Sequence, residues 1–140
     1  MKRLPVLILW LTLATSALAD PAATGALNGL RDARGAPPVV YSERLAQVAL
    51  AHARDMARQG TMTHTGSNGS TVGQRVRRAG YRWCYVSENV AMGYRSLERV
   101  LNAWAASPGH YRNMVNRKAR EFGMAQTPDR FWVMVLAAPC

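Results

Sequence analysis

The chain has 140 residues, with 18 Lys and Arg against 8 Asp and Glu, and a formal net charge of +10. This length allows one domain and excludes two. A hydrophobic fraction of 49% excludes a largely disordered chain. The charge alone would suit a nucleic-acid-binding protein, but the N-terminal segment changes that expectation.

The N-terminal segment has the pattern of a signal peptide. Two basic residues precede an almost wholly apolar run, Leu4–Ala14, and Ala17–Ala19 offers a small-x-small cleavage site. The apolar run is shorter than the ~20 residues that span a bilayer, and an uncleaved anchor is the alternative. We expect residues 1–19 to be a signal peptide and residues 20–140 to be a single domain. That domain would be exported, periplasmic or extracellular, not transmembrane after cleavage, and without a nucleic-acid partner.

The two cysteines, Cys84 and Cys140, both lie in the exported part. An oxidising compartment favours their pairing. In the chain-entropy model, a disulfide between them would stabilise the fold by about 4 kcal/mol. A free, metal-binding or intermolecular cysteine is the alternative. The CxxC spacing of a thioredoxin-like redox site is absent from the sequence.

The first half of the exported part predicts helices separated by turns. A short helix is expected within residues 20–35, and residues 36–40 must be extended because they contain two prolines. The clearest helix starts after Ser42 and ends at Gly60, since apolar residues recur there at three- and four-residue steps. A polar, turn-rich loop, residues 61–70, follows it.

The second half mixes helices with strands. The expected elements are a helix at 71–79, a strand at 81–91, a helix capped by Ser96 and broken at Pro108-Gly109, a turn or short helix at 110–115, and strands at 122–125 and 131–137. A hairpin turn is expected at Asp129-Arg130. Helices that must cover a sheet indicate a mixed α+β domain.

Four residues could take part in chemistry. His52 lies on the apolar stripe of a helix, where a packed histidine is the expected role, whereas apolar periodicity explains neither His64 nor His110. Glu88 lies within an apolar strand, where a carboxylate is costly unless it is paired or faces a cleft. Zinc takes such ligands, so His64, Glu88 and His110 could form a site if the fold brings them together. Neither HExxH nor paired cysteine ligands support this.

A catalytic serine is not indicated. Ser67 lies in the sequence Gly66-Ser67-Asn68-Gly69, which lacks the GxSxG spacing of a nucleophile elbow. The strand-turn-helix context of such an elbow is also missing at this position. We therefore expect Ser67 to serve a turn.

Four ordered segments carry a resemblance to a known family. They are HTGSNGST at 64–71, AGY at 79–81, ENVA at 88–91 and WAASPGHYRNM at 104–114. Together they resemble the bacterial branch of the CAP superfamily, which groups cysteine-rich secretory proteins, antigen 5 proteins and plant pathogenesis-related proteins. The resemblance covers about residues 24–138, nearly the whole exported part.

The resemblance implies a three-layer α-β-α sandwich with a central, mainly antiparallel sheet and a broad cleft. In many members two histidines and two acidic residues line the cleft and can bind a divalent metal, often zinc. By motif, His64 matches the first histidine, Glu88 the glutamate and His110 the second histidine. The resemblance therefore implies zinc or another divalent metal at His64, Glu88 and His110.

Two positions depart from the family pattern. Asn68 stands where bacterial relatives often have aspartate, and Ser87 replaces the usual glycine before Glu-Asn. An amide is a weaker metal ligand than a carboxylate and cannot act as a general base. The expected cleft is therefore lined by His64, Asn68, Glu88 and His110. Its catalytic set is incomplete, and Glu88 is the candidate catalytic residue if there is one.

These features favour an exported, non-enzymatic binding module of the cell envelope or extracellular space, and we expect a monomer. The resemblance implies a lipid or a peptide as its partner, and the positive charge of an exported domain adds an anionic envelope polymer. The alternative is a metal-dependent hydrolase or peptidase acting in the periplasm or outside the cell. In that case Glu88 would be a base or ligand, and a zinc-bound water the nucleophile.

Basic residues gather in two groups: Arg75, Arg77, Arg78 and Arg82 in one, and Arg117, Lys118 and Arg120 in the other. Solvated positive faces are the ordinary explanation of such groups. If they bind a partner, an exported protein would meet anionic polymers or lipid head groups before nucleic acid.

Overall fold

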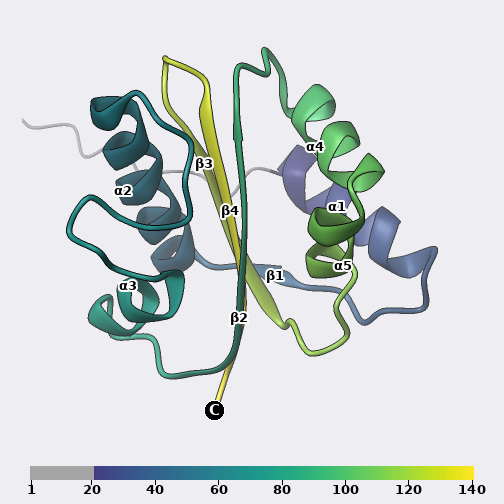
Figure 1. Ribbon diagram of the computed structural model, residues 1–140. Helices are drawn as coiled ribbons and strands as arrows, with labels where there is room; N and C mark the ends of the chain where they lie inside the picture. The colour runs from purple at the N-terminus through teal and green to yellow at the C-terminus, as the bar shows by residue number, and fades with distance from the viewer. Residues whose placement is uncertain (1–20) are drawn as a thin grey trace, which may run out of the picture.

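The computed structural model describes residues 21–140, so the expected signal peptide lies outside the described residues. Within them, helices on two sides enclose a sheet, giving three layers (Figure 1). The helices are α1 (Pro21–Asp32), α2 (Glu43–Gln59), α3 (Val72–Arg78), α4 (Leu97–Ala106) and α5 (Pro108–Met114). The strands are β1 (Val40–Tyr41), β2 (Trp83–Met92), β3 (Glu121–Gln126) and β4 (Phe131–Pro139).

The four-stranded sheet has the order β1-β3-β4-β2. Strands β3 and β4 form a hairpin, and β2 pairs antiparallel with the other side of β4. Only the short β1 is parallel to its neighbour, β3. The expected α+β sandwich with a mainly antiparallel sheet is therefore confirmed. The two-residue β1 falls where the two prolines predicted only an extended segment.

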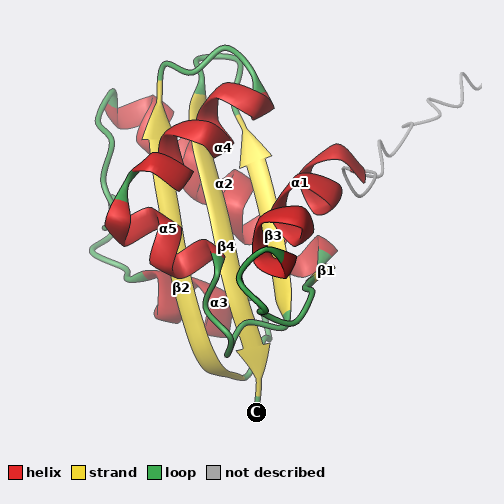
Figure 2. Cartoon of the chain, turned by 90° about the vertical axis from the view of Figure 1, so that its right-hand side faces the viewer, coloured by secondary structure: helices red, strands yellow, loops and turns green. Residues whose placement is uncertain are grey.

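Helices cover both faces of the sheet, so its central strand β4 is apolar on both sides. Trp132, Met134 and Leu136 face the layer of α1, α4 and α5, whereas Val133 and Val135 face α2 and α3. Figure 2 shows α1, α4 and α5 in front of the sheet, with α2 and α3 behind it. The structure thus has two hydrophobic cores, one on each side of the sheet.

The backbone of α2 packs directly on β3 at Gly123. A β-carbon built at Gly123 would lie 2.0 Å from the backbone nitrogen of Ala46. No side chain fits at that distance, because even a methyl group would overlap the helix backbone. The absence of a side chain at this strand position therefore sets how closely α2 approaches the sheet.

The helix starts follow local capping rules. The side chain of Ser42 accepts a hydrogen bond from the backbone N–H of Leu45, and Thr71 forms a capping box with Gln74. The expected break at Pro108-Gly109 was wrong in one respect: α5 begins at Pro108 itself. Proline is tolerated there because the first helical N–H has no partner inside the helix. His110 consequently lies in the first turn of α5.

Arg31 joins α1 to the end of α5. Its fully buried guanidinium donates to the backbone carbonyls of Met114 at 2.8 Å and Asn116 at 3.1 Å, and its Nε donates to that of Pro37 at 2.8 Å. Burial lowers the pKa of this arginine. No sequence pattern pointed to Arg31, although this residue holds the helix that carries His110.

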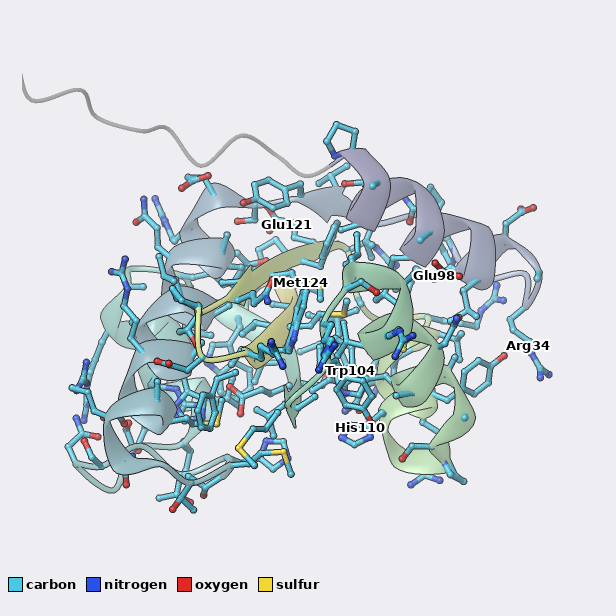
Figure 3. All side chains as sticks on the ribbon, turned by 90° about the horizontal axis from the view of Figure 1, so that it is seen from above. Arg34, Glu98, Trp104, His110, Glu121 and Met124 are labelled. Carbon is cyan, nitrogen blue, oxygen red and sulfur yellow. A yellow bond between two sulfur atoms is a disulfide. The ribbon has the colours of Figure 1, made fainter. Side chains whose placement is uncertain are left out.

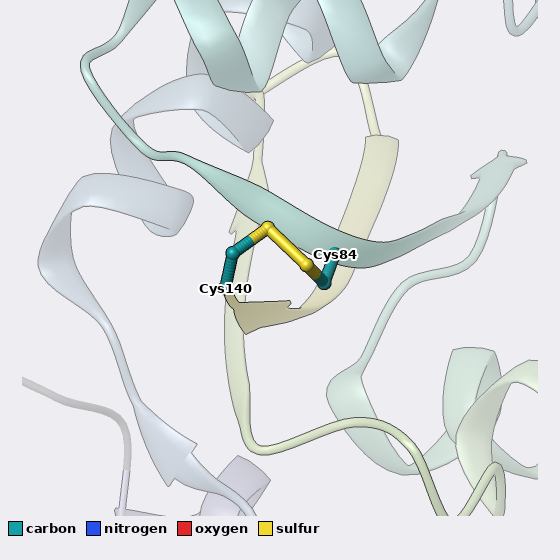
Figure 4. Close-up of a disulfide and its surroundings, with 2 residues drawn as sticks. All are labelled: Cys84 and Cys140. Carbon is teal, nitrogen blue, oxygen red and sulfur yellow. A yellow bond between two sulfur atoms is a disulfide. The ribbon is translucent and has the colours of Figure 1, made fainter.

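A disulfide joins Cys84 in β2 to Cys140, as Figure 4 shows. The expected pairing is therefore confirmed, and neither cysteine is free. The bridge ties the last residue of the chain to the start of β2. No helix within residues 21–140 is both long and apolar enough to cross a membrane.

Candidate functional site

The candidate site lies at the free edge of the sheet, along β2 (Figure 2). Side chains from the α4–α5 layer donate hydrogen bonds to two backbone carbonyls of this edge strand. Trp104 Nε1 donates to the carbonyl of Val90 at 3.1 Å, and Asn113 Nδ2 donates to that of Glu88 at 3.3 Å. These bonds protect the edge from pairing with another strand. They also fix α4 and α5 against β2.

Glu88 is the centre of a buried polar cluster on the α2 side of β2. Its side chain is 1% exposed, and its two oxygens contact different partners. Arg75 Nη2 donates to Glu88 Oε2 at 2.6 Å, and His64 Nδ1 lies 2.9 Å from Glu88 Oε1. Of the two alternatives for this carboxylate, pairing or facing a cleft, the structure shows pairing. His64 itself is 58% exposed, so the pair reaches from the core to solvent.

His52 lies behind this cluster and is buried, in agreement with its expected packed role. Its Nε2 is 2.8 Å from the carbonyl oxygen of Thr63, which can only accept, so Nε2 carries a proton and donates. Nε2 is also 3.9 Å from Glu88 Oε1. Burial lowers the pKa of His52 despite the nearby Glu88 charge. The neutral ring therefore anchors the 61–70 loop to helix α2, in which His52 lies.

His110 approaches β2 from the other layer. Asn89 Nδ2, on the opposite face of the strand from Glu88, donates to the carbonyl of His110 at 3.1 Å. His110 Nδ1 lies 2.9 Å from Ser107 Oγ, and its ring centroid is 6.3 Å from that of Trp104. Figure 3 shows Trp104 and His110 next to each other. Burial, and then the charge of His64, lowers the pKa of His110.

Asn68 lies apart from His110. Its Oδ1 accepts a hydrogen bond from the backbone N–H of Ser70 at 3.0 Å, a turn contact. It lines a pocket of about 210 Å³ that it shares with Asp55 and Arg75 among others. The neighbouring Ser67 donates from both its N–H and its hydroxyl to Asp55, each at 2.7 Å. The first of these bonds is the main cause that lowers the pKa of Asp55. Ser67 thus serves a turn, as expected.

A second pocket, of about 230 Å³, opens beside His110 and wraps around the edge of β2. We call it the β2-edge pocket. Its walls come from the 61–70 loop, the end of β2 and the helices α4 and α5. It is lined by Met62, Val90, Ala91, Met92, Tyr94, Ala103, Trp104, Ser107 and His110. Among these described residues there is no carboxylate, and His110 supplies the imidazole.

The cluster does not fit a divalent ion as it stands. Glu88 uses one oxygen for Arg75 and the other for His64, so neither faces an open coordination position. Within residues 21–140, no three His, Cys, Asp or Glu residues are arranged to hold a metal ion. Zinc at His64, Glu88 and His110 therefore stays a prediction, and it would require the contact between His64 Nδ1 and Glu88 Oε1 to open.

Sequence reasoning missed three residues of the site: Arg75, Asn89 and Asn113. Arg75 was grouped with solvated arginines, but its side chain is only 11% exposed. Asn113 Nδ2 also donates to Asn89 Oδ1 at 2.9 Å, which joins α5 to β2. A buried carboxylate at Glu88 signalled that a cation was needed, but the sequence did not indicate which cation.

Arg75 belongs to the first of the two basic groups in the sequence, and the remaining residues of that group, Arg77, Arg78 and Arg82, are exposed. An anionic partner for them stays a prediction.

Comparison with known proteins agrees with this architecture. The sequence model of the cysteine-rich secretory protein family, CAP, matches residues 24–136. The uncharacterized protein YkwD of Bacillus subtilis is 27% identical over 97 residues, which are 69% of this chain and 38% of that protein. The chain thus spans well under half the length of this curated relative.

Two solved structures are similar in fold. One is an extracellular protein with an SCP domain from Bacillus anthracis, with a TM-score of 0.78 and 23% identity over 83% of this chain and 39% of that one. The other is an outer surface protein of Borrelia burgdorferi, with a TM-score of 0.78 and 25% identity over 85% of this chain and 91% of that one. Both are described as proteins of the cell exterior.

Proposed function

Because the chain belongs to the cysteine-rich secretory protein family, we propose that it acts outside the cytoplasm as a non-enzymatic ligand-binding domain. The signal-peptide pattern of residues 1–19 and the extracellular or outer-surface relatives support this location. The ligand site that we propose is the β2-edge pocket, with His110 and Ser107 at its polar side.

One observation carries this proposal: the carboxylate of Glu88 is already fully engaged. A general base must reach the proton that it abstracts, but both Glu88 oxygens are held by Arg75 and His64. No serine in an elbow motif replaces it. The cluster therefore acts as a rigid support for the loop and strand that line the pocket.

The lining of the pocket indicates the chemistry of the ligand. Ala91, Ala103 and Trp104 offer apolar surface, while His110 and Ser107 offer hydrogen-bonding groups at one side. Small-molecule sites commonly combine an apolar lining with a few polar groups that fix orientation. We propose an amphipathic ligand, such as part of a lipid or a short peptide, with its apolar group in the pocket and its polar group at His110.

The dye 8-anilino-1-naphthalenesulfonate, which has apolar rings and one anionic group, is a suitable probe. We expect its fluorescence to rise on binding, and the dye to bind at least about 10-fold less tightly to Ala103→Phe, because a phenyl ring would fill the pocket. Ala106→Phe is the control, since Ala106 is exposed on the same helix and does not line the pocket. Equal dye binding by Ala103→Phe and wild type would contradict the proposed site.

The alternative function, a hydrolase, draws support from one contact. Glu88 orients an exposed imidazole, since His64 Nδ1 donates to its carboxylate at 2.9 Å and leaves Nε2 free to face solvent. An oriented histidine can serve as an acid or base. Turnover of a peptide panel by wild type, lost in Glu88→Gln, would favour this alternative over binding alone.

Divalent metal binding is tested separately. Zinc titration should distinguish wild type from a His64→Ala/His110→Ala variant if these residues are ligands. Because metal ligands must be deprotonated, zinc affinity should then weaken as the pH falls through the histidine range near ~6.5. Identical zinc stoichiometry in the two proteins would refute the predicted metal site.

A further inference from the structure

The two exposed methionines of the described chain lie in one place. Met62 and Met92 are each 50% exposed, whereas Met56, Met114 and Met134 are buried in the two cores. A methionine usually fills gaps in a core, so an exposed pair needs another explanation. Both residues line the β2-edge pocket, together with His110. Two methionines and one histidine therefore line the same space, of about 230 Å³.

The backbone near each of these residues is held by the buried network. His52 Nε2 binds the carbonyl of Thr63, the residue after Met62. Met92 pairs with Phe131 at the end of β2, and the next residue, Gly93, donates to Arg130. Asn89 Nδ2 donates to the carbonyl of His110. The chain thus presents three donor side chains from fixed positions, which is what a binding site requires.

The ring of His110 is suited to binding an ion. Its Nδ1 contacts Ser107 Oγ at 2.9 Å, which leaves Nε2 as the ring nitrogen free for a ligand. A hydrogen bond at one ring nitrogen is the usual way in which a metal-binding histidine is oriented. The flexible methionine side chains can move their sulfurs toward this nitrogen, because each has three rotatable bonds.

The donor set selects a soft ion. Thioether sulfur favours Cu(I), whereas carboxylate and carbonyl oxygens favour Mg²⁺, Ca²⁺ and Mn²⁺. The described residues that line the pocket include no carboxylate and no cysteine thiolate. The carboxylate of Glu88, which does not line the pocket, is occupied by Arg75 and His64. The side-chain oxygens of the lining are the neutral hydroxyls of Tyr94 and Ser107, so its soft donors are two methionines and one histidine.

We propose that Met62, Met92 and His110 bind one Cu(I) ion through two thioether sulfurs and one imidazole nitrogen. This inference goes beyond the binding of an amphipathic ligand and does not depend on it. The ion would occupy the space that the apolar group of such a ligand needs. Cu(I) and the anilinonaphthalene dye should therefore exclude each other from the pocket.

The test is an anaerobic competition for Cu(I) between the protein and bicinchoninate, a coloured Cu(I) chelator. Wild type should withdraw one equivalent of Cu(I). The double variant Met62→Leu/Met92→Leu should bind it at least about 100-fold more weakly, since loss of even a supporting contact costs roughly 10- to 100-fold. Leucine is apolar and close to methionine in volume, so the double variant should still fold, and its urea unfolding curve checks this. Met124→Leu is the matched control, because Met124 lines a different pocket.

Equal Cu(I) binding by wild type and the Met62→Leu/Met92→Leu variant would overturn the inference, as would no Cu(I) binding by wild type. Copper X-ray absorption on the wild-type complex should show two sulfur neighbours, and a shell of only nitrogen and oxygen would also overturn it. If Cu(I) binds as expected but the dye does not, the copper site stands and the amphipathic ligand is refuted. The two proposals can therefore fail separately.

Discussion

Arg75 and Glu88 form an ion pair between α3 and β2, with Arg75 Nη2 2.6 Å from Glu88 Oε2 and side chains that are 11% and 1% exposed. Arg75 also donates to the backbone carbonyls of Ser70 at 2.8 Å and His64 at 3.1 Å. One arginine therefore holds the carboxylate and both ends of the loop segment that carries His64. The polar cluster, the loop and the edge strand form one structural unit.

Replacing Arg75 should be costly. Arg75→Met leaves the carboxylate of Glu88 buried without its cation, which we expect to lower the free energy of unfolding by about 3–5 kcal/mol. Urea unfolding measures this change. The double variant Arg75→Met/Glu88→Gln should lose less than the sum of its two single variants, because the pair acts as a unit. Arg78→Met, at an exposed position of the same helix, is the control and should change stability by less than ~0.5 kcal/mol. Additive effects of Arg75→Met and Glu88→Gln would contradict the coupling.

The stability of the fold should fall in mild acid. Burial lowers the pKa of His52 and that of His110 in the folded state. As the pH falls through the unfolded value near ~6.5, the unfolded chain takes up protons that the folded chain does not, so unfolding becomes more favourable. We expect a lower free energy of unfolding in urea at about pH 5 than at about pH 7.5. His52→Gln should reduce this difference, and an unchanged pH dependence in that variant would contradict the assignment to His52.

Gly123 should tolerate no side chain. Gly123→Ala places a methyl group 2.0 Å from the backbone nitrogen of Ala46. Overpacking of this kind commonly costs about 1–3 kcal/mol, and we expect at least about 3 kcal/mol here because backbone is the obstacle. Gly25→Ala is the matched control, since nothing lies within 4 Å of its β-carbon. That control should be neutral or should stabilise helix α1 by up to about 1 kcal/mol. A thermal melt in which Gly25→Ala lost more stability than Gly123→Ala would refute the close approach of α2 to β3.

The disulfide should contribute to stability and not to the pocket. The Cys84→Ser/Cys140→Ser variant should lose about 4 kcal/mol by the chain-entropy model, because the bridge closes a long loop. Dye binding should be unchanged as long as the variant is folded, since neither cysteine lines the β2-edge pocket. Weaker dye binding by the folded variant would mean that the bridge shapes the site.

Local patterns in the sequence predicted the elements well, because local chemistry determines them. Ser42 and Ser96 cap helices where expected, and Arg130 has a positive φ of 63° in the expected hairpin turn. The extent of β2 and the start of α5 at Pro108 were less accurate. At Pro108, the sequence alone does not distinguish a proline that ends one helix from a proline that begins the next.

The partners of the site residues were harder to predict, since they depend on contacts between distant segments. The carboxylate of Glu88 signalled a buried charge, but its cation, Arg75, belongs to a run of arginines whose other members are exposed. Asn113 contacts Asn89 across 24 positions, and no spacing rule connects them. The β2-edge pocket draws residues from a loop, a strand and two helices, so only the folded structure reveals it.

Two indole groups report on the proposed ligand site. Trp104 Nε1 donates to Val90 beside the β2-edge pocket, whereas Trp83 Nε1 donates to Gly73 beside α3. In a ¹⁵N–¹H correlation spectrum, titration with the anilinonaphthalene dye should shift the indole signal of Trp104 and the amide signals of Met62 and Met92, and leave Trp83 unchanged. A titration that shifts Trp83 and leaves Trp104 unchanged would contradict a binding site at the edge of β2.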